Sequence, residues 1–228
     1  TPTGRAGSTE MTWFLLSLTA ALGLATADAL TKRFLSDLPA YRMGVVRILS
    51  TAPWMILALV FIPSAAPDRT FWLAMGAALP LELSAFFLYM KALKLSPLSL
   101  SLPFLAFTPV FMILTGRFIL GESIGPGGTA GIGLIVLGAY VLNLSRMKAG
   151  FLEPVRAVIR EPGSWIMLLV SFIYSLTAPL GKVAILHSNP FFFAAVYNLV
   201  LSALIVGLWP VASGRAPVRS IFSRPGPM

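Results

Sequence analysis

The sequence contains no cysteine and a single histidine, His187. Without cysteine, disulfides, thiolate nucleophiles and sulfur-ligated metals are excluded. One histidine cannot form a histidine metal cluster or a relay of histidines, so no metal and no cofactor is expected. Charge is scarce as well. Charged residues make up 11% of the 228 residues, whereas soluble domains carry roughly a quarter. So little charge cannot cover a water-facing surface.

Apolar residues take the place of the missing charge. They make up 57% of the chain, and the mean hydropathy is +0.86. The formal net charge of +9 would suggest nucleic acid as the partner of a soluble protein. Here the Lys and Arg residues lie between long apolar runs, where they set orientation and meet anionic lipid headgroups. The lipid bilayer is therefore the expected partner, and nucleic acid is not.

A helix that crosses the hydrocarbon core needs about 20 mostly apolar residues. The composition and these runs predict an all-α integral membrane protein. Short connections with Pro, Gly, Ser and Asn separate the runs, which favours antiparallel neighbours. Seven segments approximately meet the length: 12–31, 43–63, 71–91, 97–117, 124–145, 164–185 and 191–212.

Two further segments are not predicted to cross the membrane. Residues 146–163 carry apolar residues on one helical face and arginines elsewhere, which is typical of a short helix lying in the lipid–water interface. A flexible basic linker is the alternative. Residues 213–228 form a basic, Pro-rich tail.

An internal repeat begins again about 150 residues along the chain. Aligning Lys32 with Lys182 places 24–32 beside 174–182, with an apolar helix before and after each Lys. Five spans then precede the second copy. Because five is odd, that copy must enter the membrane in the opposite sense, as in the inverted repeats of secondary transporters. A complete second unit would end at about residue 300, so we expect a ten-helix bundle that is C-terminally truncated here.

Residues 12–145 resemble the EamA-like transporters of the drug/metabolite transporter superfamily, and 164–212 do so more loosely. The resemblance rests on five features in this order: Tyr89-Met-Lys-Ala-Leu93, Pro103, Pro109-Val110, Gly121-Glu122 and the Gly-rich run from Gly131 to Gly138. It implies a secondary transporter, not an enzyme, that exports a small metabolite or drug by alternating access through two five-helix repeats. It also implies the inner membrane of a bacterium, and a homodimer is a further candidate assembly.

Two other function classes remain open at this point. One is an integral membrane enzyme that acts on lipid-linked substrates, which would require clustered acidic or histidine residues at a membrane face. The other is a non-transporting helical subunit. Orientation is open too. The basic residues gather on the side opposite the N-terminus, which the positive-inside rule places in the cytoplasm. The resemblance instead implies that both termini are cytoplasmic.

Glu82 is the principal candidate site residue because it lies near the middle of the third span. An intramembrane carboxylate costs several kcal/mol unless it is protonated, paired or facing water. Met75, Ala78, Ala85 and Tyr89 share its face by helical spacing, and Tyr89 could add a hydroxyl. Glu82 either binds a cationic group of the substrate, carries a coupling proton, or is a protonated carboxyl bonded to a neighbouring helix.

The remaining candidates divide by chemistry. Asp28 and Lys32 are four residues apart and can pair along one helix face; Lys32 and Lys182 either mark gates or extend to the interface. Pro103 and Pro109 each remove a backbone hydrogen bond, which makes either a passive kink or a binding carbonyl. Glu122 is expected to cap the fifth span. Further cavity candidates are Tyr174, Tyr197 and Asn198. Expected helix-packing glycines are Gly127, Gly131 and Gly138.

Overall fold

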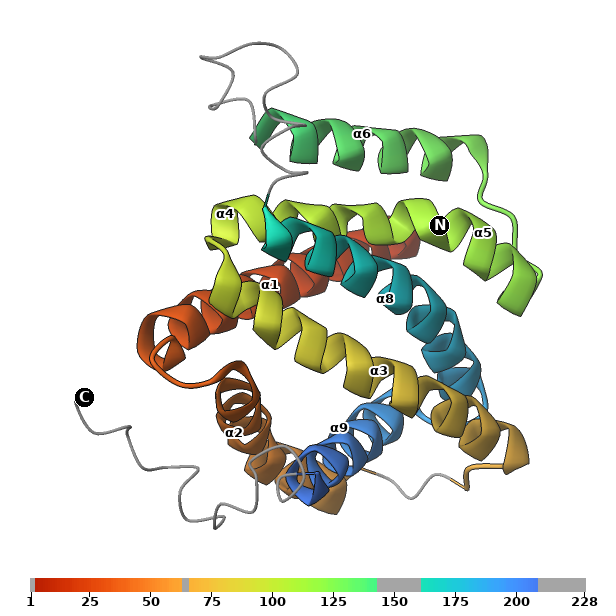
Figure 1. The fold of residues 1–228 in the computed structure, drawn as a ribbon. Helices are drawn as coiled ribbons and strands as arrows, with labels where there is room; N and C mark the ends of the chain where they lie inside the picture. The colour runs from red at the N-terminus through yellow and green to blue at the C-terminus, as the bar shows by residue number, and fades with distance from the viewer. Residues whose placement is uncertain (1–2, 63–65, 143–160, 209–228) are drawn as a thin grey trace, which may run out of the picture. The chain divides into compact units, whose positions relative to one another are not determined.

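A computed structural model describes residues 3–62, 66–142 and 161–208, and these residues form helices and no strand (Figure 1). Six helical segments are long and apolar enough to cross a membrane, and a seventh is shorter. The prediction of an all-α membrane protein is confirmed. The elements are α1 (Thr3–Leu35), α2 (Ala40–Phe61), α3 (Arg69–Leu95), α4 (Leu98–Ser101), the 3-10 helix η1 (Leu102–Phe107), α5 (Thr108–Leu120), α6 (Pro126–Leu142), α8 (Pro162–Leu186) and α9 (Pro190–Gly207).

The chain divides into two compact units, Thr1–Asp37 and Leu38–Met228. The first consists of α1, whose apolar part is Met11–Leu35. Lys32 and Arg33 lie in its last turn, so this helix continues beyond the predicted end of the first span at residue 31. Cations at that position complement the negative end of the helix dipole.

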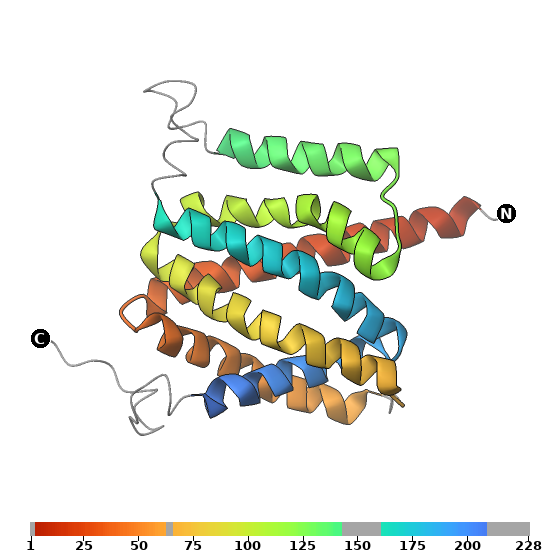
Figure 2. The same cartoon turned by 45° about the vertical axis from the view of Figure 1, so that its right-hand side comes forward.

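The second unit is a bundle in which α3 packs most extensively against α8. Figures 1 and 2 both show α8 lying between α3 and α5, and α2 pairs with α9. Buried apolar residues from α2, α3, the end of α8 and α9 form the core. Its members are Val45, Ile48, Phe71, Ala74, Met75, Leu79, Ala184, Leu201 and Ile205.

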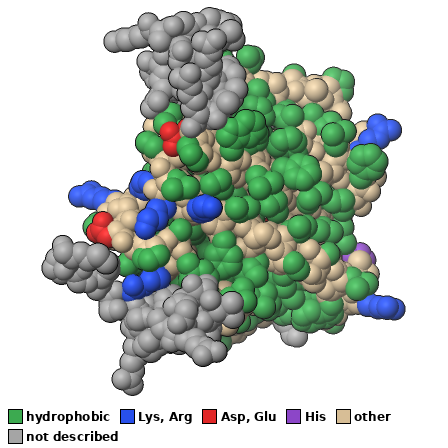
Figure 3. All heavy atoms as spheres, viewed as in Figure 1, with side chains coloured by type: hydrophobic (Ala, Val, Ile, Leu, Met, Phe, Trp, Pro, Cys, Tyr) green, Lys and Arg blue, Asp and Glu red, His purple; other side chains and the backbone are tan. Residues whose placement is uncertain are grey.

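Large apolar side chains also cover the outside of this bundle, as a lipid-facing surface requires. Trp54, Phe61, Phe118 and Leu134 are each more than two-thirds exposed. Figure 3 shows hydrophobic side chains across the middle of the face in view, with Lys and Arg at two opposite edges. Soluble proteins rarely expose so much apolar surface to water, whereas the hydrocarbon of a bilayer solvates such a surface favourably.

The fourth predicted span is broken. Residues 97–117 were expected to form one helix, but α4, η1 and α5 occupy this stretch in turn. Pro103 lies at the start of η1 and Pro109 at the start of α5. A proline has no N–H to donate and fits best in the first turn of a helix. The two prolines therefore mark the places where the helix type changes.

A third proline is accommodated by a neighbouring helix. Pro179 lies inside α8 and cannot donate to the carbonyl of Ser175, four residues earlier. The hydroxyl of Thr115, from α5, donates to that carbonyl at 2.6 Å in a buried position. An unsatisfied carbonyl is costly at membrane depth, so Thr115 compensates for the proline and joins α5 to α8.

Changing Thr115 to Val is therefore expected to lower the free energy of unfolding by about 0.5–1.5 kcal/mol. In a Pro179→Ala background the loss should shrink, because the introduced alanine supplies an N–H for the Ser175 carbonyl. Denaturant titration of the purified chain measures both values. Thr129→Val is the control, since the Thr129 hydroxyl is exposed and bonds only to the Gly125 carbonyl, one turn earlier. Equal losses in both backgrounds would contradict this role.

Helix α6 has 17 residues and packs mainly against η1. No heavy atom lies within 4 Å of a Cβ built at Gly127, Gly131 or Gly138, so no described residue uses these glycines for close packing, and their packing role stays a prediction. The expected interfacial helix or linker at 146–163 falls almost entirely outside the described residues. The tail at 213–228 lies outside them as well.

Candidate functional site

Glu82 is the middle residue of α3, thirteen residues from both Arg69 and Leu95. At 1.5 Å per residue, this places it about 20 Å of helix from either end. The hydrocarbon core is about 30 Å thick, so the Glu82 side chain cannot reach the headgroups. The carboxyl group must find its polar surroundings inside the bundle.

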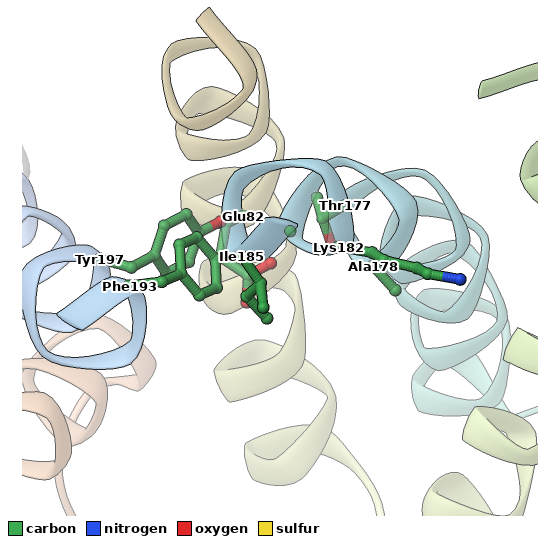
Figure 4. A pocket seen from close by; sticks show the side chains of 8 residues that line it. Glu82, Thr177, Ala178, Lys182, Ile185, Phe193 and Tyr197 are labelled. Atoms are coloured by element: carbon green, nitrogen blue, oxygen red, sulfur yellow. The ribbon is translucent and has the colours of Figure 1, made fainter. Parts of the chain in front are cut away.

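Those surroundings are a pocket of about 330 Å³ between α3, α8 and α9 (Figure 4). Glu82 comes from α3. Thr177 is close enough to act as a hydrogen-bond donor to the Glu82 carboxyl group. Its Oγ1 also lies 3.4 Å from the Tyr174 carbonyl oxygen, and the one hydroxyl hydrogen serves either acceptor. The pocket is lined by Glu82, Thr177, Ala178, Gly181, Lys182, Ile185, Phe193 and Tyr197.

One wall of the pocket is aromatic. The rings of Phe193 and Tyr197, one turn apart on α9, lie with centroids 5.0 Å apart and planes inclined by 35°. A Cβ built at Gly181 would lie 3.4 Å from the Phe193 ring. The absence of a side chain at Gly181 therefore keeps space open beside the ring, and a larger residue at this position would fill the pocket.

Lys182 borders the pocket, but its charge points elsewhere. Figure 4 shows the ammonium directed away from Glu82 and Tyr197. Its Nζ lies 2.6 Å from each carboxylate oxygen of Glu122, in the loop between α5 and α6. Glu122 was expected to cap the fifth span. Because α6 begins only at Pro126, Glu122 instead forms an exposed ion pair with α8.

A second contact joins loops at the same end of the bundle, which we call the His187 end because α8 stops there. Asp68 caps α3: its Oδ1 accepts from the Phe71 N–H at 2.9 Å. Its Oδ2 lies 2.7 Å from Nδ1 of His187, the residue that follows α8. The Phe71 N–H, together with His187, holds the pKa of Asp68 below its usual range.

Asp68→Asn is expected to lower the melting temperature of the purified chain at about pH 7 and to have a smaller effect at a pH well below 3.8. The Asp68 pKa is lower in the folded chain than its ordinary value of 3.8. Its ionised form therefore stabilises the fold above that value, and the contribution is lost as pH falls through the folded pKa. Asn preserves the helix cap, so the variant isolates the charge. Equal shifts at both pH values would contradict this origin.

The opposite end of the bundle, the Ser96 end, is also held by polar contacts. The Ser96 hydroxyl, just after α3, donates to Glu161, the residue before α8. The Lys94 ammonium donates to the Leu38 carbonyl at 2.7 Å. The second unit thus has side-chain contacts between loops or helix termini at both membrane faces, with the pocket between them.

Three of the predicted site residues meet in the pocket: Glu82, Lys182 and Tyr197. Tyr89 does not, since its buried ring lies 5.5 Å from the Arg47 guanidinium carbon, beside α2. Asn198 also faces α2, where its amide lies 2.9 Å from the Thr51 hydroxyl.

The other predicted residues are distributed along the chain. Tyr174 lies on α8 one turn before Thr177 and is not a lining residue. Pro103 and Pro109 lie at the breaks of the fourth span. Asp28 and Lys32 are one helical turn apart in α1, in the first unit. Their roles stay predictions.

Sequence reasoning did not single out Thr177, Gly181, Ile185 or Phe193 as site residues. A signal was available, because the first three recur at intervals of four residues on α8, and Phe193 precedes Tyr197 by four. Such spacing places residues on one helix face. Among the described residues, no group of three or more His, Asp or Glu side chains could hold a metal ion.

The long apolar helices, the lipid-compatible surface and the carboxylate at mid-membrane depth define a multi-pass integral membrane protein with a polar interior site. The family model of the EamA-like transporters matches residues 11–144, more than half of the 228 residues. The chain belongs to the EamA-like transporter family, and the resemblance noted for residues 12–145 is confirmed. Neither a curated protein nor a solved structure matches the chain.

Proposed function

We propose that this chain is part of a secondary transporter that exports a small molecule by alternating access, with the pocket between α3, α8 and α9 on the substrate path. Family membership supports a membrane transporter. The finer assignment rests on one observation: Glu82 lies in a pocket halfway across the bundle. Substrate sites of secondary transporters typically lie near the bilayer midplane.

A functional carboxylate is favoured over a structural one by its surroundings. No cationic side chain among the described residues forms an ion pair with Glu82. Thr177 is a single neutral donor, which offsets little of the cost of an intramembrane carboxylate. A carboxyl group that destabilises the fold in this way is expected where it binds a substrate or a transported proton. In this proposal Glu82 therefore binds the substrate or a coupling proton.

Alternating access also requires contacts that can open at one membrane face while the other stays closed. The pairs Asp68–His187 and Lys182–Glu122 at the His187 end are exposed, and exposed ion pairs contribute little to stability because water screens them. Contacts of this strength can break during a transport cycle. The Ser96–Glu161 bond occupies the equivalent place at the Ser96 end.

Helix boundaries support the proposed inverted repeat. Helix α1 ends at Leu35 and α8 ends at Leu186, an offset of 151 residues. The next helices begin at Ala40 and Pro190, an offset of 150 residues. We therefore keep the assignment of 12–145 as one repeat and 164–212 as the start of a second.

Untargeted mass spectrometry of the growth medium tests this function. Cells that express the gene are expected to release at least one small molecule that cells carrying an empty vector do not. Gly181→Leu should abolish the release, because its side chain fills the pocket beside Phe193. Gly76→Leu is the matched control, since Gly76 is exposed on α3 and nothing lies within 4 Å of a Cβ there. Identical media from all strains would refute the proposal.

A further inference from the structure

The pocket's charge balance points to the class of molecule that it accepts. Two of its lining residues carry charge, Glu82 and Lys182. The Lys182 ammonium is held at 2.6 Å by both oxygens of Glu122 and is directed away from the pocket. When Glu82 is ionised, the interior charge is therefore negative and comes from this one carboxylate. An anion would meet repulsion there, and a neutral molecule would leave the carboxylate without a charged partner.

The wall facing this carboxylate suits a cation as well. Aromatic faces attract ammonium groups electrostatically, by about 0.5–2 kcal/mol depending on desolvation. Phe193 and Tyr197 supply two such rings 5.0 Å apart, and the Tyr197 phenol is close enough to Glu82 to interact with it electrostatically. The carboxyl group, the phenol and the two rings thus line the same pocket, and together they favour a cationic nitrogen there.

The rest of the lining is mostly apolar. Ala178, Gly181 and Ile185 add no polar side-chain atom, and Thr177 adds one hydroxyl. A polyamine or a sugar would leave most of its polar groups without partners, which disfavours binding. The volume of about 330 Å³ is at the low end for ligand sites. These properties suit a small molecule with one charge and an apolar body.

The arrangement of the lining residues also gives this molecule a direction. Glu82 and Thr177 lie at the deep end, whereas Ile185 and Phe193 lie within one turn of the ends of α8 and α9 at the His187 end. The negative group is therefore at the deeper end of the pocket. A cation entering from the His187 end passes the apolar and aromatic residues before it meets Glu82.

We propose that the pocket binds a small organic monocation, an ammonium with an apolar or aromatic body, with its nitrogen at Glu82 and its body against Phe193 and Tyr197. This inference rests on the proposed transport function and specifies its substrate class. Three observations support it: the lining of the pocket, the two aromatic rings on one wall, and the Lys182 ammonium, which points out of the pocket toward Glu122. A purely proton-carrying Glu82 is the competing outcome of the test.

Three probes with matched apolar bodies separate these outcomes: 2-phenylethylammonium, 2-phenylethanol and 3-phenylpropionate. Their binding to the purified chain is measured by calorimetry in phosphatidylcholine nanodiscs, with empty nanodiscs subtracted. We expect the cation to bind about tenfold or more tightly than the alcohol, and the anion to bind weakest. Glu82→Gln should remove the preference for the cation. Asp37→Asn, the same carboxyl-to-amide change at an exposed position that does not line the pocket, should preserve it.

Three results would overturn the cation assignment. Equal affinity for the three probes would do so, as would a preference for the cation that survives Glu82→Gln. Absence of cation binding would do so too. These failures are distinguishable from failure of the transport function. If the probes bind without charge preference and Gly181→Leu blocks them, the pocket remains a binding site. Export itself is judged separately by the growth-medium comparison.

Discussion

Replacing Glu82 with leucine is expected to stabilise the folded chain by about 1–3 kcal/mol and to abolish export. The stabilisation follows from removing a carboxyl group about 20 Å of helix away from either end of α3. The loss of export follows from the proposed role of the same group. Binding sites commonly keep residues that reduce the stability of the fold because the same residues are needed for function.

Denaturation midpoints of wild type, Glu82→Leu and Glu82→Gln measure the first effect, and the growth-medium assay measures the second. Ala77→Leu, at an exposed position of the same helix, serves as the control and should change stability by less than about 0.5 kcal/mol. If Glu82→Leu instead destabilised the chain, the carboxyl would be a structural group bonded to Thr177, and the functional interpretation would fail.

Gly163→Ala is expected to lower the free energy of unfolding by about 1–3 kcal/mol, although alanine favours helix more than glycine does. Gly163 lies in the first turn of α8, where this helix meets the end of α3. A Cβ there would lie 2.2 Å from Ser96 Oγ, 2.6 Å from Ser96 Cβ and 3.3 Å from the Ala92 carbonyl oxygen. A rotation of the Ser96 side chain cannot relieve all three, so the helices must separate.

A double-mutant cycle tests the cause of this loss. Ser96→Gly removes two of the three close atoms, so Gly163→Ala should cost less in that background. Gly133→Ala is the matched control because nothing lies within 4 Å of a Cβ at Gly133, and it should be neutral or stabilising. A loss at Gly163 that is unchanged by Ser96→Gly would show that the contact with Ser96 is not responsible.

Much of the fold could be predicted because a membrane-spanning helix is formed by consecutive apolar residues, which are visible in the sequence without knowledge of the packing. Seven apolar stretches became helical segments whose apolar parts end within five residues of the predicted bounds, since a run of about 20 apolar residues has few alternatives in a bilayer. The Gly121-Glu122 turn was also readable: Gly121 has φ of +69°, a conformation that glycine adopts without strain. Pro103 and Pro109 were recognised as irregular positions, although the 3-10 helix between them was not.

The position of Glu82 along its membrane span could be predicted, but the side chains that surround it could not. The sequence alone placed Glu82 at the middle of a span, because position along a helix is counted in residues. It did not separate Tyr197, which lines the pocket, from Tyr89, which lies beside Arg47. It also assigned Glu122 to a helix cap, whereas the structure pairs it with Lys182 across 60 residues of sequence.

The physical reason is that a membrane helix is apolar on every side. In a soluble protein the polar face identifies the direction of solvent and so the rotation of each helix. In lipid that signal is weak, and rotation is set by contacts between helices, such as Gly163 against Ser96 and Thr115 against Ser175. Sequence by itself determined which segments cross the membrane and where a charge lies within one. Only the packing of α3, α8 and α9 decided which side chains share a pocket with that charge.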